Sequence, residues 1–221
     1  MDVELIAHTP DPDKLATLAA LTCYGREVPP VSGISQELVE EVLGKVKESG
    51  HHSVIEHGSF TFAVTGVSRA LTHQLVRHRI ASYSQQSQRY VDMEDFVSVI
   101  PPSIQDEDAE EIYREFMKDV ERTYSRLKEK IPVEDARYVL PNAVPTNIIV
   151  TMNARELWHF FSLRCCRRAQ WEIREMADWM LELVREVAPV IFRDAGAPCL
   201  RGPCPEAPDL SCGKPFRRER P

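Results

Sequence analysis

Residues 59–67 read Ser-Phe-Thr-Phe-Ala-Val-Thr-Gly-Val, an alternation of apolar and polar side chains within one short segment. Phe60, Phe62 and Val64 fall on one side of an extended backbone, and the threonines fall on the other. Because successive side chains of a strand point to opposite faces of a sheet, this segment predicts a half-buried strand. The elements around this strand indicate the fold class.

Strands and amphipathic helices surround this segment on both sides. Residues 2–7, 96–100 and 146–152 read as further strands. Apolar residues at helical spacing and N-capping residues predict helices, with Ser35, Ser68 and Asn153 as expected caps. The helix after Ser68 is expected to run into Arg77-His78-Arg79, to place Gln74, Arg77 and His78 on a face that can address a ligand, and to be followed by a loop. In the longest expected helix, at 106–130, the spaced apolar residues are Ile112, Phe116, Val120 and Leu127. The other helices are expected at 12–24, 35–49, 106–130, 154–165 and 168–187. Strands separated by long helices predict a single α+β domain with an antiparallel or mixed sheet flanked by long helices.

The composition restricts the functional class. The 221 residues carry 27 basic and 34 acidic side chains, a net charge of −7, which disfavours general nucleic-acid binding. The basic residues concentrate at 77–89 and 164–168. No apolar run reaches the length of a membrane span, and the N-terminus lacks a signal-peptide layout, so we expect a cytoplasmic protein without membrane attachment. The six cysteines lack the spacing of a disulfide scaffold and are expected to be reduced.

Residues 77–90 read Arg-His-Arg-Ile-Ala-Ser-Tyr-Ser-Gln-Gln-Ser-Gln-Arg-Tyr. So many hydrogen-bond donors in one segment need an anionic ligand or abundant water to satisfy them. An exposed polar loop would be the ordinary explanation for an isolated Arg-His-Arg triplet. The chain contains neither a G-x-G-x-x-G nor a P-loop pattern, so any nucleotide must be held by other groups.

The triplet is followed by a seven-residue interval, Ser87 and then Arg89-Tyr90. This order resembles the signature of flavin-dependent thymidylate synthases, which make dTMP from dUMP without a catalytic cysteine. The resemblance covers residues 1–195, the expected catalytic domain, and leaves 196–221 as an irregular tail rich in Cys, Pro and Arg. It implies reductive methylation of dUMP with methylenetetrahydrofolate, FAD reduced by NADPH, and a homotetramer with flavin held between subunits.

The resemblance also assigns roles residue by residue. Arg164 matches the catalytic arginine. The positions matching flavin contacts are Ser53, Arg77, His78, Arg79, Gln85, Asn153, Ala154, Arg155 and His159. Those matching dUMP contacts are Gln74, Leu75, Val76, Arg77, Gln85, Gln86, Ser87, Gln88, Arg89, Arg137 and Arg164. The chain departs from many relatives at Ser84 and Gln85, where they carry Asn and Glu, and at Arg168, where they carry His.

Three segments that contain histidine or cysteine raise the question of a metal site or a nucleophilic cysteine. Residues 50–57 hold three histidines and a glutamate, but their spacing matches no usual metal-ligand pair, so no metal is expected. Cys165 and Cys166 lie among arginines that would favour a thiolate nucleophile, yet adjacent cysteines are as often structural. The cysteines of the tail form no C-x-x-C pair. The resemblance itself argues against a nucleophilic cysteine.

Two other classes of function remain open on the sequence. The basic segment 77–89 suits an RNA- or nucleotide-binding regulatory module, and the histidines with the tail cysteines suit a zinc-stabilised interaction protein. A flavin absorption band in the purified protein would support the enzyme and neither alternative.

The spacing of two arginines makes a geometric prediction. Arg155 and Arg164 are nine positions apart, about 180° on a continuous helix at roughly 100° per residue. If Arg155 faces flavin, Arg164 faces away from that same flavin. The two side chains are therefore expected to serve different active sites, or one site from different subunits.

Overall fold

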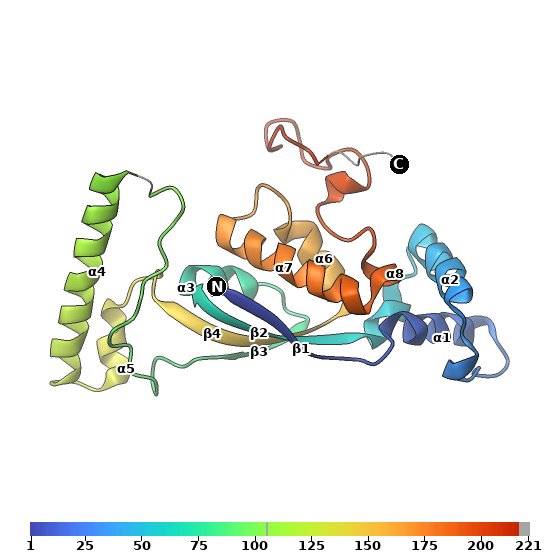
Figure 1. The fold of residues 1–221 in the computed structure, drawn as a ribbon, viewed down its shortest axis with the longest axis horizontal. Helices are drawn as coiled ribbons and strands as arrows, with labels where there is room; N and C mark the ends of the chain where they lie inside the picture. The colour runs from blue at the N-terminus through green and yellow to red at the C-terminus, as the bar shows by residue number, and fades with distance from the viewer. Residues whose placement is uncertain (105, 217–221) are drawn as a thin grey trace.

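A four-stranded antiparallel sheet forms the centre of the computed structural model, which describes residues 1–104 and 106–216 (Figure 1). The strand order is β1-β2-β4-β3. Every pair of neighbouring strands is antiparallel, so the sheet is the first of the two predicted kinds. The strands are β1 (Asp2–His8), β2 (Ser59–Ser68), β3 (Ala81–Gln85) and β4 (Pro145–Asn153).

One face of this sheet carries the core. Phe60, Phe62 and Val64 of β2 are fully buried, which confirms the predicted alternation. Val150 of β4 lies opposite Phe62 in the register and is also buried. Each such side chain stabilises the fold by about 1.5–3 kcal/mol relative to an exposed position. The helices that cover this face are α3 (Arg69–Leu75), α6 (Ala154–Arg164), α7 (Trp171–Val187) and α8 (Pro189–Phe192) (Figure 1).

Two N-terminal helices, α1 (Pro12–Tyr24) and α2 (Gln36–Ser49), pack together at one end of the sheet (Figure 1). Helix α2 begins where predicted, because the Ser35 hydroxyl accepts a hydrogen bond from the Leu38 amide. The short 3-10 helices η1 (Val31–Gly33) and η2 (His52–His57) flank α2, and η2 contacts α1 and α6. This arrangement places the histidine-containing segment beside the start of α6.

Helix α4 (Glu107–Lys128) stands away from the sheet (Figure 1). With α5 (Val133–Ala136) and η3 (Arg137–Val139) it surrounds a small separate core around Tyr124. Val120 is buried as the apolar spacing predicts, but Ile112 and Phe116 are 70% and 58% exposed. The expected apolar stripe is therefore wrong over the first half of α4, because that half extends beyond the elements that would cover it.

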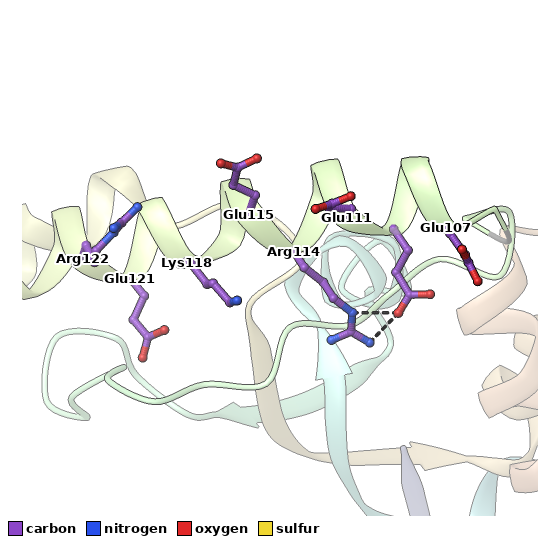
Figure 2. A pocket seen from close by; sticks show the side chains of 8 residues that line it. Glu107, Glu111, Arg114, Glu115, Lys118, Glu121 and Arg122 are labelled. Carbon is purple, nitrogen blue, oxygen red and sulfur yellow. Dashed lines mark hydrogen bonds and ion pairs between the residues drawn. The ribbon is translucent and has the colours of Figure 1, made fainter.

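A hollow of about 840 Å³ runs along α4, and Figure 2 shows that its lining residues come from this helix alone. Acidic and basic side chains alternate there, and Arg114 pairs with Glu110 one turn earlier. None of the residues assigned to the active site lines this hollow. We interpret it as the solvated face of an extended helix. Within the described residues, no helix is long and apolar enough to cross a membrane.

Three sequence predictions need correction around the polar segment 77–90. Helix α3 ends at Leu75, so Arg77-His78-Arg79 lies in the turn that follows and not on the helix. Residues 81–85, read as loop, form the edge strand β3 paired with β4. Residues 96–100 form no strand, because Phe96 packs into the small core beside α4 and the segment has no strand partner. Strand pairing, which is present at 81–85 and absent at 96–100, thus overrides the local preference at both places.

The C-terminal segment is irregular, as predicted, apart from the 3-10 helix η4 (Pro198–Leu200). It runs back over the helical layer near α6 and α7 (Figure 1). The last five positions of the predicted tail, 217–221, lie outside the described residues.

Candidate active site

Arg164, the last residue of α6, is held by two neighbours from the α3 end of the chain. Its Nε donates to His78 Nε2 at 3.1 Å. Its Nη1 and Nη2 donate to Gln74, to the side-chain oxygen at 3.5 Å and to the main-chain carbonyl at 3.3 Å. Among the described residues, no carboxylate forms an ion pair with this guanidinium. In the described part of the chain, no anion therefore neutralises the charge of Arg164, and burial lowers its pKa.

His78 lies at the centre of this network and is only 4% exposed. Its Nδ1 is 3.0 Å from Glu156 Oε1, so both ring nitrogens are engaged. Burial and the neighbouring Arg164 lower the pKa of His78 to about 4, which keeps the imidazole neutral at physiological pH. The sequence placed His78 with Gln74 and Arg77 on a ligand-facing side of the helix. That placement is wrong, because His78 points into the protein.

Tyr83 ties β3 to the turn that carries His78. Its hydroxyl lies 2.8 Å from two carbonyl oxygens, those of Leu75 and His78. Burial raises the pKa of this phenol, so the hydroxyl keeps its proton and remains a donor. Gln85, at the end of β3, donates to the Thr72 hydroxyl of α3 at 3.0 Å. The turn with Arg77 and His78 is therefore fixed on both sides by β3.

Two of the expected phosphate ligands converge on Glu134. Arg89 Nε lies 2.8 Å from the Glu134 carboxylate, and Arg137 Nε donates to the Glu134 carbonyl at 3.0 Å. Ser87 Oγ accepts from the Arg89 amide at 3.2 Å. Residues that are far apart in the sequence thus form one cationic group. Exposed guanidinium groups of this kind suit a phosphate.

Arg69 adds a cation that the sequence reading missed. Its Nη2 donates to the Gln86 carbonyl at 2.6 Å. Its Nε is buried without a hydrogen-bond partner in the described part of the chain. Burial and the nearby charge of Arg137 both lower the pKa of Arg69. A second arginine beside Arg137 strengthens the preference of this region for an anion.

Residues that match flavin contacts lie at both ends of this region. Arg77 and Arg79 are exposed, and no ion pair engages either of them among the described residues. Their free donors fit an anionic group such as the diphosphate of FAD. The His159 ring lies 5.6 Å from the His78 ring. Ser53 is exposed in η2.

The start of α6 is built from three further residues of the predicted flavin set. Asn153 Oδ1 caps the helix by accepting from the Glu156 amide, and the buried Ala154 donates its amide to Gly58. Arg155 forms an ion pair with Glu56 of η2. Because Arg155 contacts η2 whereas Arg164 contacts His78, the two arginines point to different segments, as their spacing predicts.

The remaining residues assigned to dUMP follow the chain between Gln74 and Arg89. Leu75 is buried, whereas Val76 is 44% exposed. Gln86 Oε1 accepts from the Asn147 amide at 3.3 Å, and Gln88 is half-buried. Gln85 is turned toward α3, so its amide is occupied by protein contacts.

The tail forms one wall of a cavity of about 310 Å³ beside Arg164. Arg168 Nη1 lies 2.6 Å from the Glu206 carboxylate, and the Arg167 guanidinium stacks 4.5 Å from the Phe216 ring centre. The replacement of His by Arg at position 168 therefore provides a partner for the tail. The lining residues include Arg164, Cys166, Arg168, Cys199, Cys204 and Glu206.

The cysteine and histidine clusters form no further centre. Across the described residues, no group of three His, Cys, Asp or Glu side chains is arranged to hold a metal. All six cysteines are free thiols. Burial raises the pKa of the Cys165 thiol, which removes the thiolate character a nucleophile needs.

Comparison with known proteins identifies the family. Residues 4–190 match the model of the family described as thymidylate synthase complementing protein. Three similar proteins are named flavin-dependent thymidylate synthase. That of Geobacter sulfurreducens is 52% identical over 97% of this chain and 94% of its own length. That of Clostridium tetani is 48% identical over 96% of this chain and 93% of its own length. That of Pyrococcus furiosus is 47% identical over 92% of this chain and 89% of its own length.

These matches cover almost all of the α+β domain that carries Arg164 and the segment 77–90, and they define the class of protein as a methyl-transferring flavoenzyme. The chain belongs to the flavin-dependent thymidylate synthase family.

Proposed function

We propose that this chain converts dUMP to dTMP, with methylenetetrahydrofolate as one-carbon donor and NADPH as reductant of bound FAD. The observation that carries the proposal is the Arg164 guanidinium, which pairs with no carboxylate of the described residues and which three hydrogen bonds hold in place. FAD supplies the hydride that completes the methyl group. The protein supplies the orientation and the charge.

Arg164 acts electrostatically. C5 of a pyrimidine is a weak nucleophile until negative charge develops on the ring. A guanidinium is too weak a base to remove the N3 proton, but a fixed positive charge stabilises the ring anion, as an oxyanion hole stabilises its oxyanion. The neutral His78 is suited to hold Arg164, because it accepts a hydrogen bond without adding a competing charge.

Arg89, Arg137 and Ser87 bind the phosphate of dUMP in this proposal, and Arg69 adds positive charge beside them. Glu134 neutralises Arg89 in the absence of substrate. The phosphate replaces that carboxylate as the partner of Arg89 when dUMP binds. A doubly charged phosphate offers more acceptor oxygens than one carboxylate, which favours the exchange.

The direct test uses the purified protein loaded with FAD. We expect dTMP formation that requires dUMP, methylenetetrahydrofolate and NADPH, each omitted in turn. A flavin-loaded protein that forms no dTMP with all three present would refute the proposal. Protein that binds RNA but no flavin would instead support the regulatory alternative.

We also propose a homotetramer in which subunits share active sites, since Arg155 and Arg164 point to different segments. Mixing inactive Arg155→Ala chains with inactive Arg164→Ala chains should restore part of the dTMP synthesis, because some mixed sites contain both arginines. The measurement is activity in oligomers whose mixed composition has been verified by mass spectrometry. No recovery in such oligomers contradicts the shared site.

A further inference from the structure

Glu156 is a buried carboxylate with an unusual partner. It lies in the first turn of α6, where only 7% of the residue is exposed. Burial raises its pKa, and among the described residues the group within ion-pair distance is His78, not a lysine or arginine. A buried carboxylate is costly unless a donor satisfies it. The hydrogen bonds of His78 show which donor satisfies Glu156.

The hydrogen bonds of His78 fix its tautomer. Arg164 Nε carries a hydrogen and has no lone pair, so the bond at His78 Nε2 requires an unprotonated Nε2. The proton of the neutral ring is then on Nδ1, 3.0 Å from the Glu156 carboxylate that accepts it. Glu156 therefore selects the one tautomer that can accept from Arg164. In the other tautomer two N–H groups would face each other.

We propose that Glu156 is a positioning residue for Arg164 that acts through His78, an inference that rests on the proposed role of Arg164 in dTMP synthesis. The bond to His78 is the shortest of the three that hold the guanidinium, at 3.1 Å against 3.3 and 3.5 Å to Gln74. Without Glu156 the imidazole loses its fixed tautomer, and the guanidinium keeps only the two longer bonds. The pairing resembles the way a carboxylate orients an imidazole in other enzymes.

The chain contains a matched control for this role. Glu172 lies in the first turn of α7 and is 2% exposed, so its position and burial resemble those of Glu156. Its carboxylate accepts from the amide and hydroxyl of Ser68, which begins α3. Glu172 thus joins α7 to the N-cap of α3, and among the described residues no hydrogen bond or ion pair links it to His78 or Arg164. Replacing it tests the cost of losing a buried carboxylate without disturbing the guanidinium.

The experiment compares Glu156→Gln, Glu156→Leu and Glu172→Leu as flavin-loaded holoenzymes. Glutamine keeps an oxygen that accepts from Nδ1, so Glu156→Gln should retain kcat within a few-fold. Leucine removes the acceptor, and kcat should fall by about ten- to a hundredfold, the usual cost of losing an orienting partner. KM for dUMP and flavin content should change by less than about threefold. Glu172→Leu should lose stability but keep kcat per flavin-loaded site.

Several outcomes would overturn the inference. A flavin-loaded Glu156→Leu with wild-type kcat removes the positioning role, and an equal loss of kcat in Glu172→Leu reduces it to general stability. If Glu156→Leu does not fold, ¹⁵N chemical shifts of His78 in the wild-type protein, assigned with His78→Gln, decide the question. A proton on Nε2 rejects the inference, and a proton on Nδ1 supports it. A fully active Arg164→Ala enzyme would instead remove the catalytic role of Arg164, and flavin-loaded wild-type protein that forms no dTMP would refute the proposed function itself.

Discussion

Two of the arginines that contact dUMP in the proposed reaction, Arg164 and Arg89, are held in opposite ways. Arg164 is half-buried, bonded to neutral groups and not neutralised by a protein carboxylate within the described structure. The Arg89 side chain is 52% exposed and pairs with a Glu134 side chain that is 49% exposed. The charge proposed to act on the ring is therefore fixed before the substrate arrives, whereas the charge proposed to bind the phosphate is held by a contact that water weakens. Arg164, the residue proposed to stabilise the ring anion, is thus the one whose position is fixed in advance.

The largest effect should follow from removing Arg164. Arg164→Ala is expected to lower dTMP formation by about a hundred- to a thousandfold, the cost of losing one preorganised donor at a developing charge. Flavin content and folding should be retained, and NADPH oxidation should decline less than methylation. Single-turnover measurements of dTMP will separate these steps. Arg174→Ala is the control, because this half-buried arginine on α7 donates to the Arg167 carbonyl and is not among the residues assigned to dUMP or flavin.

A second effect concerns stability at low pH, and it tests whether His78, which holds Arg164, is kept neutral by burial. The pKa of His78 is about 4 in the folded protein, below its ordinary value of 6.5. The unfolded chain therefore binds more protons between these values, and stability falls as pH decreases from 6.5 toward 4. We expect a loss of roughly 2 kcal/mol in the free energy of unfolding between pH 7 and pH 5 from this residue.

Urea unfolding of the wild type and of His78→Gln at the two pH values measures this loss. Burial also lowers the pKa of His52, which adds a contribution of the same sign to both proteins. The difference between the two proteins therefore isolates His78. An equal decrease in both would mean that His78 is not held neutral.

Removal of Arg89 should have a smaller effect. Arg89→Ala is expected to weaken dUMP binding by roughly ten- to a hundredfold, because one charged contact to the phosphate is lost. Flavin content should change less. Arg114→Ala provides the matched control, since Arg114 is a similarly exposed arginine that pairs with a glutamate on α4. Unchanged dUMP affinity in titrations of Arg89→Ala would remove Arg89 from the phosphate site.

The smallest effect should come from Glu134, which occupies Arg89 in the absence of substrate. An exposed ion pair contributes at most about 1 kcal/mol, so Glu134→Gln should strengthen dUMP binding by no more than about fivefold. Isothermal titration with dUMP measures the change. Weaker binding in this variant would show that Glu134 orients Arg89 for the phosphate and does not compete with it.

The sequence predicted those parts of the fold that local patterns encode. The alternation around Phe60 and Phe62 identified β2, and the caps at Ser35 and Asn153 marked where α2 and α6 begin. The edge strand β3 was missed, because its residues are mostly polar and only the pairing with β4 makes them a strand. The mostly apolar residues 96–100 were misleading for the same reason, since they pair with no strand of the described residues.

The residues of the candidate site also divide into those that the sequence reveals and those that it does not. Arg164 and the segment 77–89 carry an ordered signature that the sequence displays. Glu156, Glu134 and Arg69 carry none, because each acquires its role from a residue distant in the chain. A single glutamate in the first turn of a helix is ordinarily a favourable charge at the helix dipole. The position of His78 beside Glu156 is what supports the proposed positioning role.

The insertion of β4 between β2 and β3 also bears on the order in which the protein can be assembled during synthesis. A nascent chain that ends before residue 145 contains β2, β3 and segment 77–90 but lacks the central strand that joins them. Pairings separated by 63 to 94 residues form slowly, because long loops must close first. Residues 91–144 and β4 itself must therefore be synthesised before segment 77–90 can acquire its position.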